Sequence, residues 1–194
     1  MECQLHSPTG AWHQEIPSLG AHMIYPVTMA AAVGRMYGLT DEQIRRGILE
    51  FEPTKMRMAI LHRGDDITIL NDTYNANPQS MRAAISVLAD SHSAWKVAVL
   101  GDMLELGEKG AEYHRNMGKK AVECGADIMI GKGPLMKNAC EETERAGIET
   151  MHFDTSEDIM RALDNCLRDG DTVLVKASHG TNLKDVAEYI KANF

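Results

Sequence analysis

The sequence lacks a long apolar run. Of its 194 residues 44% are hydrophobic, but stretches such as 97–100 are far too short to span a bilayer. Its first residues have neither a basic start nor a long apolar segment, so we expect no secretory signal. These absences favour a globular protein in the cytoplasm with no membrane partner.

Positive charge is also scarce. Lys and Arg total 20 against 28 Asp and Glu, which gives a net charge of −8. Binding to a nucleic-acid backbone is driven by clustered Lys and Arg, so we expect no nucleic-acid partner. An acidic total is still compatible with a local nucleotide site.

Cysteines are few and contain no CxxC pair; they are Cys3, Cys124, Cys140 and Cys166. We interpret them as buried, reduced thiols of a cytoplasmic protein, with a zinc site as the alternative. The eight histidines include no HxxxH pair, so the sequence predicts no metal cluster.

The first part of the chain predicts an irregular or strand-rich lead-in over 1–20, followed by two helices. The first helix is expected near 27–37. The second begins at Thr40, where Gln43 three residues later completes a capping-box pattern, and Pro53 ends it.

After about residue 58, short β-rich runs alternate with amphipathic helices. The runs lie at 67–70, 96–100, 127–130, 150–153 and 172–175, and the helices near 78–90, 110–124, 134–146, 156–168 and 182–192. This alternation predicts an α/β fold with a mostly parallel sheet, covered on both faces and joined by right-handed crossovers. A domain boundary is expected near 55–65.

The most informative segment, NDTYNANP at 71–78, follows a strand and opens a helix. In an open α/β sheet this junction lies at the carboxyl edge, where ligands bind. Asp72 could accept hydrogen bonds from a ribose diol, Tyr74 offers a flat face, and Asn75 offers donors and acceptors. An Asx-turn with Asn77 as helix cap is an equally good interpretation.

Two further polar loops follow strands. The segment at 100–107 carries Asp102 and Glu105, which could meet a cation or a substrate amine; the alternative is a solvated loop between turn glycines. The segment at 176–180 carries Lys176 and His179. Lys176 could pair with a phosphate, and a solvent-facing lysine is nearly as good an interpretation.

Two earlier residues are weaker candidates. His22 precedes the first helix, where a lone histidine is usually structural. Arg57 precedes the change in rhythm, and an exposed arginine is usually only solvated.

Together these segments resemble the Mur ligase family. The resemblance rests on NDTYNANP at 71–78, on GDMLELG at 101–107 with His114, and on AHMIY at 21–25, FEP at 51–53 and MRM at 56–58. It covers nearly the whole chain and is strongest to the family's D-alanyl-D-alanine-adding branch. It implies a Rossmann-like C-terminal Mur ligase domain over 58–194, preceded over 1–57 by the end of the central ATPase domain.

The resemblance implies a reaction. ATP with Mg²⁺ would phosphorylate the terminal carboxylate of UDP-N-acetylmuramoyl-tripeptide, and the amine of D-alanyl-D-alanine would displace the phosphate in peptidoglycan synthesis. The residues implied as catalytic are Arg57 and Lys176; those facing the nucleotide are Asp72, Tyr74, Asn75 and His22; those facing the substrate are Asn77, Asp102, Glu105 and His179. No metal ligand is implied in this chain.

Departures from the family pattern keep alternatives open. No GxxxxGK[ST] phosphate loop is present, so we expect the isolated chain to be inactive. Pro26 stands where many Mur ligases carry an asparagine, and 178–181 lacks the usual arginine. The alternatives are a non-catalytic nucleotide- or peptide-binding module and an amide ligase resembling folylpolyglutamate synthetase. Self-association through an exposed N-terminal segment is a further expectation.

Overall fold

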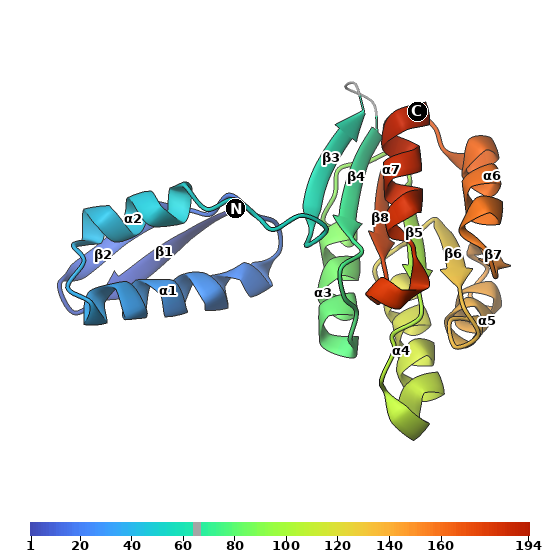
Figure 1. Ribbon diagram of the computed structural model, residues 1–194, viewed down its shortest axis with the longest axis horizontal. Helices are drawn as coiled ribbons and strands as arrows, with labels where there is room; N and C mark the ends of the chain where they lie inside the picture. The colour runs from blue at the N-terminus through green and yellow to red at the C-terminus, as the bar shows by residue number, and fades with distance from the viewer. Residues whose placement is uncertain (64–66) are drawn as a thin grey trace. The chain divides into compact units, whose positions relative to one another are not determined.

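The computed structural model describes residues 1–63 and 67–194 (Figure 1). The chain divides into an N-terminal unit, Met1–Pro53, and a C-terminal unit, Thr54–Phe194. The sequence suggested 1–57 and 58–194, so the structural division falls four residues earlier and leaves Arg57 in the C-terminal unit.

The N-terminal unit combines a β-hairpin with two helices. Its elements are β1 (Glu2–Ser7), β2 (Gly10–Glu15), the 3-10 helix η1 (Ala21–Met23), α1 (Ile24–Met36) and α2 (Asp41–Leu49). The lead-in expected over 1–20 is therefore largely an antiparallel hairpin. A small apolar core joins hairpin and helices and consists of Leu5, Ile16, Val27, Ala31, Ile44 and Ile48.

Both helices of this unit were predicted, and the start of the second is confirmed in detail. The Thr40 hydroxyl accepts from the Gln43 N–H at 3.3 Å, and the Gln43 side chain accepts from the Thr40 N–H at 2.9 Å. These bonds satisfy two N–H groups that an uncapped helix leaves free. Helix α1 starts three residues earlier than expected, because Pro26 is tolerated in a first helical turn.

The C-terminal unit is an α/β sandwich. Its strands are β3 (Ala59–Arg63), β4 (Ile67–Asp72), β5 (Lys96–Gly101), β6 (Ile128–Lys132), β7 (Glu149–Phe153) and β8 (Thr172–Lys176). Its helices are α3 (Pro78–Ala89), α4 (Gly110–Glu123), α5 (Lys137–Arg145), α6 (Ser156–Cys166) and α7 (Lys184–Asn193), with short 3-10 turns η2 (Gly107–Lys109) and η3 (His179–Thr181). The sheet order is β3-β4-β8-β5-β6-β7, and only β3 is antiparallel to its neighbour. The mostly parallel sheet is confirmed; β3 was not predicted.

Helices cover both faces of this sheet. Helices α6 and α7 pack on one face, where alternate strand residues such as Val99, Ile130 and Val175 join Leu163 and Ile190 in one core (Figure 1). Helices α3, α4 and α5 form a contiguous layer on the other face. Burial on both faces explains why the strands read as continuous apolar runs.

The position of β8 reverses the strand order within the sheet. The chain leaves β4, crosses to β5, continues outward to β6 and β7, and returns with β8 between β4 and β5. Lys176, at the end of β8, is therefore level with Asp72 of β4 and Leu100 of β5. Such a reversal of strand order opens a crevice at the carboxyl ends of the strands.

Among the residues that the structure describes, no helix has the length and apolar character that a bilayer span requires. The four cysteines are free thiols. Only Cys140 is buried; Cys3, Cys124 and Cys166 are half-buried, so the expectation of four buried thiols is wrong for three of them.

Cys140 is expected to resist alkylation in the folded protein. Burial raises the pKa of its thiol from an ordinary 9.0 to about 11, with the Glu144 carboxylate adding to the effect. At pH 8 the thiolate fraction would then be about 100-fold below that of an ordinary thiol, and only the thiolate reacts. Iodoacetamide labelling with peptide mapping should modify half-buried Cys3 and Cys124 first and Cys140 only on unfolding. Stoichiometric labelling of Cys140 in the native protein at pH 8 would contradict this.

Candidate functional site

A buried ion pair lies at the carboxyl edge of the sheet. The Lys176 ammonium donates to Asp72 Oδ2 at 2.5 Å and to the Asn75 carbonyl at 2.9 Å. Lys176 is only 1% exposed, while the Asp72 side chain keeps 15% of its surface. The lysine expected to meet a phosphate therefore has its ammonium turned onto two protein acceptors.

Burial and two neighbouring charges act on the pKa of Lys176 in opposite directions. Burial lowers the pKa of its ammonium below the ordinary 10.5, the Asp72 carboxylate raises it, and the nearby Arg57 charge lowers it again. Burial is the largest of these because an ammonium loses its hydration inside a protein. Asp72 is therefore the group that keeps a charge tolerable at this position.

The segment before β3 is tied to the same pair. The Met58 N–H donates to Asp72 Oδ1 at 3.0 Å, and the Tyr74 N–H donates to the Met56 carbonyl at 3.1 Å. Met56 and Met58 both have positive φ, 62° and 50°. That left-handed conformation is unfavourable for residues other than glycine. The hydrogen bonds to Asp72 and from Tyr74 therefore hold this backbone in place.

Arg57, Tyr74 and His179 are exposed and form a group called here the aromatic cluster. The Arg57 guanidinium lies 4.2 Å from the centre of the Tyr74 ring. The His179 ring lies 6.3 Å from the Tyr74 ring, tilted by 46°. Tyr74 is 43% exposed. A flat ring beside a guanidinium can meet both a planar group and an anion.

The two asparagines of the 71–78 segment that were predicted as site residues, Asn75 and Asn77, have different surroundings. Asn77 caps α3: its Oδ1 accepts from the Ser80 N–H at 2.8 Å, which confirms the predicted cap. That carbonyl oxygen therefore has a structural partner. Asn75 is exposed, and its Oδ1 accepts from the Ala76 N–H at 2.9 Å.

Asp102 is turned away from solvent. Its side chain is buried and accepts from the N–H of Met136 at 2.7 Å and of Leu135 at 3.2 Å, just before α5. The carboxylate thus satisfies amides at a helix start. Glu105 is exposed and stands at φ 63°. Of the two acids expected to face a substrate, only Glu105 presents its side chain to solvent.

Sequence reasoning missed the role of Ser178, which joins three loops. Its Oγ accepts from the Leu104 N–H at 3.0 Å and donates to the Ala76 carbonyl at 3.3 Å, and its N–H donates to the Asp102 carbonyl at 3.2 Å. Its place two residues after a strand was visible in the sequence. The partners of its Oγ, however, lie 74 and 102 residues away along the chain.

His114 plays a similar internal role. It is fully buried, its Nε2 accepts from the Met103 N–H at 2.9 Å, and its Nδ1 faces the Gly110 carbonyl at 2.6 Å. Within the described residues, no three His, Cys, Asp or Glu side chains gather into a group that could hold a metal ion.

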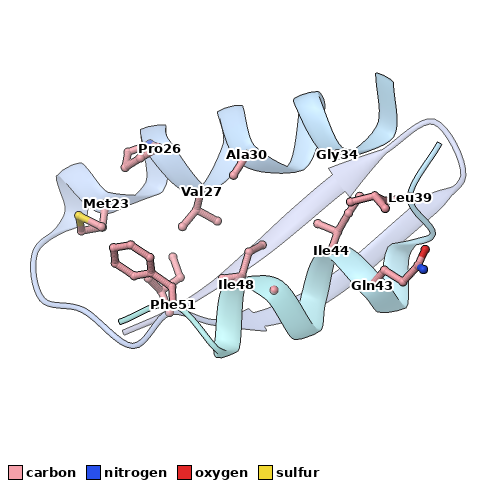
Figure 2. A pocket seen from close by; sticks show the side chains of 12 residues that line it. Met23, Pro26, Val27, Ala30, Gly34, Leu39, Gln43, Ile44, Ile48 and Phe51 are labelled. Carbon is pink, nitrogen blue, oxygen red and sulfur yellow. The ribbon is translucent and has the colours of Figure 1, made fainter. Parts of the chain in front are cut away.

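The N-terminal unit carries an apolar pocket of its own. It has a volume of about 340 Å³ and lies between α1 and α2, with Val27, Ile48 and Phe51 pointing toward one another (Figure 2). His22 lies in η1 of this unit and is exposed; it is not a lining residue of the pocket. Of the predicted site residues, His22 alone belongs to the N-terminal unit.

Comparison with known proteins gives consistent matches. The family model described as "Mur ligase, glutamate ligase domain" matches residues 56–179. The UDP-N-acetylmuramoyl-tripeptide–D-alanyl-D-alanine ligases of Buchnera aphidicola and Bacillus subtilis are 33% and 31% identical, over 96% and 89% of this chain. Among solved structures, a crystal structure of MurF from Acinetobacter baumannii superposes with a TM-score of 0.87 at 27% identity, covering 98% of this chain.

These matches also define how much of the relatives is represented. The chain spans 40% of the Buchnera protein, 38% of the Bacillus protein and 42% of the Acinetobacter chain. The family model covers most of the C-terminal unit, including the aromatic cluster and the buried ion pair. The chain belongs to the Mur ligase family.

Proposed function

We propose that this chain is the C-terminal portion of an ATP-dependent ligase that adds D-alanyl-D-alanine to UDP-N-acetylmuramoyl-tripeptide in peptidoglycan synthesis. The observation that carries the proposal is the aromatic cluster, exposed at the strand-order reversal of a Mur ligase sheet. The names of the relatives supply the substrates. A cytoplasmic location follows from those substrates as part of the same proposal.

The cluster suits the nucleotide side of such a reaction. Arg57 is exposed beside a flat ring and would stabilise charge on the phosphoryl group as it passes to the carboxylate. Tyr74 and Asn75 would contact the nucleoside or its phosphates, and His179, whose ring lies 6.3 Å from the Tyr74 ring, would line the adjoining substrate side. The amine then attacks the acyl carbon of the acyl phosphate and displaces inorganic phosphate, so positioning and charge stabilisation are the main demands.

Other groups have different roles in this proposal. Glu105 is the exposed acid placed to meet the incoming dipeptide amine, while Asp102 and Asn77 shape their loops. Mg²⁺ would neutralise phosphate charge when bound; no cluster of ligands for it occurs among the described residues.

The N-terminal unit would be the end of the central ATPase domain. Helix α1 exposes Tyr25, Met29, Val33 and Met36, which follow a helical spacing along one face. Exposed apolar stripes of this kind usually contact another surface. The remaining part of the ligase would cover it, and self-association of this chain is the competing prediction.

The proposal is tested by joining this chain to the N-terminal portion of the Bacillus subtilis relative. Phosphate release with both substrates and Mg-ATP should require the joined protein, because the isolated chain has no phosphate loop. Arg57→Ala in the joined protein should lower kcat/KM by roughly 10³-fold, the scale for losing a charge at a transferring phosphoryl group. Arg57→Lys is the matched control and should retain more activity. Turnover by the isolated chain, or full activity of the alanine variant, would refute the proposal.

A further inference from the structure

We propose that Lys176 is a positioning residue: through Asp72 it holds backbone segment 56–58 on the C-terminal unit and so keeps the Arg57 guanidinium over Tyr74. Its importance for ligation rests on the proposed function. The positioning itself rests only on contacts within the C-terminal unit.

The first link is the orientation of the Asp72 carboxylate. Oδ2 meets the Lys176 ammonium, and Oδ1 is thereby directed at the Met58 N–H, 3.0 Å away. The Asn75 carbonyl accepts a second bond from the same ammonium at 2.9 Å. With no cation beneath it, a carboxylate at this partly open edge could turn toward water and release Met58.

The second link is the backbone of residues 56–58. Met56 and Met58 both occupy the left-handed region of backbone conformation, which residues other than glycine rarely adopt. The segment lies directly before β3, and its two bonds to the β4 side of the sheet are the Met58 N–H to Asp72 and the Tyr74 N–H to Met56. Losing one of them should let this backbone relax to a more favourable conformation.

The third link is Arg57 itself. It lies between the two left-handed residues, and its guanidinium stands 4.2 Å from the Tyr74 ring. An exposed arginine with many rotamers gains a defined place only if its backbone is held. Lys176 thus acts on Arg57 through Asp72 and Met58 without touching a ligand; burial keeps its ammonium from solvent.

The test is native-state hydrogen exchange of this chain, read by NMR at single amides without any nucleotide. Lys176→Met keeps the length of the side chain and removes its charge. We expect the Met58 and Tyr74 amides to exchange roughly tenfold faster than the loss of global stability predicts, because the opening is local. Trypsin should also cleave after Arg57 faster in the Lys176→Met variant than in the parent protein, and this increase should exceed that at other sites.

Leu163→Ala is the control. Leu163 is fully buried in α6 and belongs to the core on the face of the sheet covered by α6 and α7. Leu163→Ala should lower global stability, and the exchange of the Met58 and Tyr74 amides should accelerate only in proportion to that loss. If Lys176→Met does not fold, Asp72→Asn replaces it, since the neutral amide cannot hold the ammonium and the Met58 N–H in the same way.

Uniform acceleration across the unit in the lysine or asparagine variant, equal to that in Leu163→Ala, would overturn the positioning role. The experiment involves no turnover, so failure of the ligase assay would leave this result standing. Conversely, unaltered exchange at Met58 would refute the positioning role while leaving the proposed ligase activity untouched.

Discussion

Asp72→Ala is expected to lower the free energy of unfolding of the C-terminal unit by about 3 kcal/mol, the scale for leaving one member of a buried ion pair alone. Lys176 is 1% exposed in the parent protein, and the substitution leaves its ammonium with only the Asn75 carbonyl as a partner. It also removes the acceptor of the Met58 N–H. Urea denaturation followed by circular dichroism measures the loss.

The pH dependence of the same variant is a second signature. Burial places the pKa of Lys176 below 10.5 in the folded state, and Asp72 opposes this. Between the folded pKa and 10.5 the unfolded chain binds more protons, so stability rises with pH in that window. Without Asp72 the pKa of Lys176 in the folded state falls further, so the stability deficit of the variant should shrink as the pH rises from 7 toward 10.5 and Lys176 becomes neutral.

A double variant measures the coupling energy between Asp72 and Lys176. Asp72→Ala with Lys176→Met removes both charges, so it should be clearly more stable than the sum of the single effects predicts. If Asp72→Ala leaves the melting curve unchanged while abolishing activity of the joined ligase, Asp72 is a ligand contact, as the sequence suggested. Additive effects in the double variant would show that the ion pair carries no coupling energy.

Gly118→Ala is expected to destabilise by about 3 kcal/mol, at the upper end for overpacking a core. Gly118 lies in α4, and a Cβ there would stand 2.8 Å from Ala139 Cα and 2.9 Å from Ala139 C, and also against the Ala139 carbonyl oxygen, all backbone atoms of α5. Backbone cannot turn aside as a flexible side chain can. The helices must therefore separate, which opens the layer that α4 and α5 form on the sheet.

Gly47→Ala is the matched control, because it makes the same change inside α2 where a new Cβ meets nothing within 4 Å. It should stabilise its helix by roughly 0.5–1 kcal/mol, since alanine is the better helix former. Thermal melts of both variants and of the parent protein measure these changes in stability. A Gly118→Ala protein as stable as the parent would show that α4 and α5 are not packed backbone to backbone.

Much of the fold could be predicted because its signals are local. The capping residues Thr40 and Asn77 are confirmed, and five parallel strands were located from their apolar runs. Strand β3 was missed because an edge strand of five residues, Ala59–Arg63, carries no periodic pattern of its own. It becomes a strand by pairing with β4.

The site was predictable only as a set of loops. The sequence placed three polar loops after strands, and the parallel sheet brings them to one edge. It could not assign the acids within them. Asp102 and Glu105 are three residues apart, yet one is buried against the start of α5 and the other is exposed.

The sequence by itself determined the alternation of strands and helices, their caps and the polar loops, because these depend on neighbours a few residues apart. Only the tertiary structure decided what the charged side chains do. Lys176 and Asp72 are 104 residues apart and meet because β8 inserts beside β4. Whether a charge faces solvent or a buried partner depends on desolvation and on groups brought in by strand pairing, which no local pattern records.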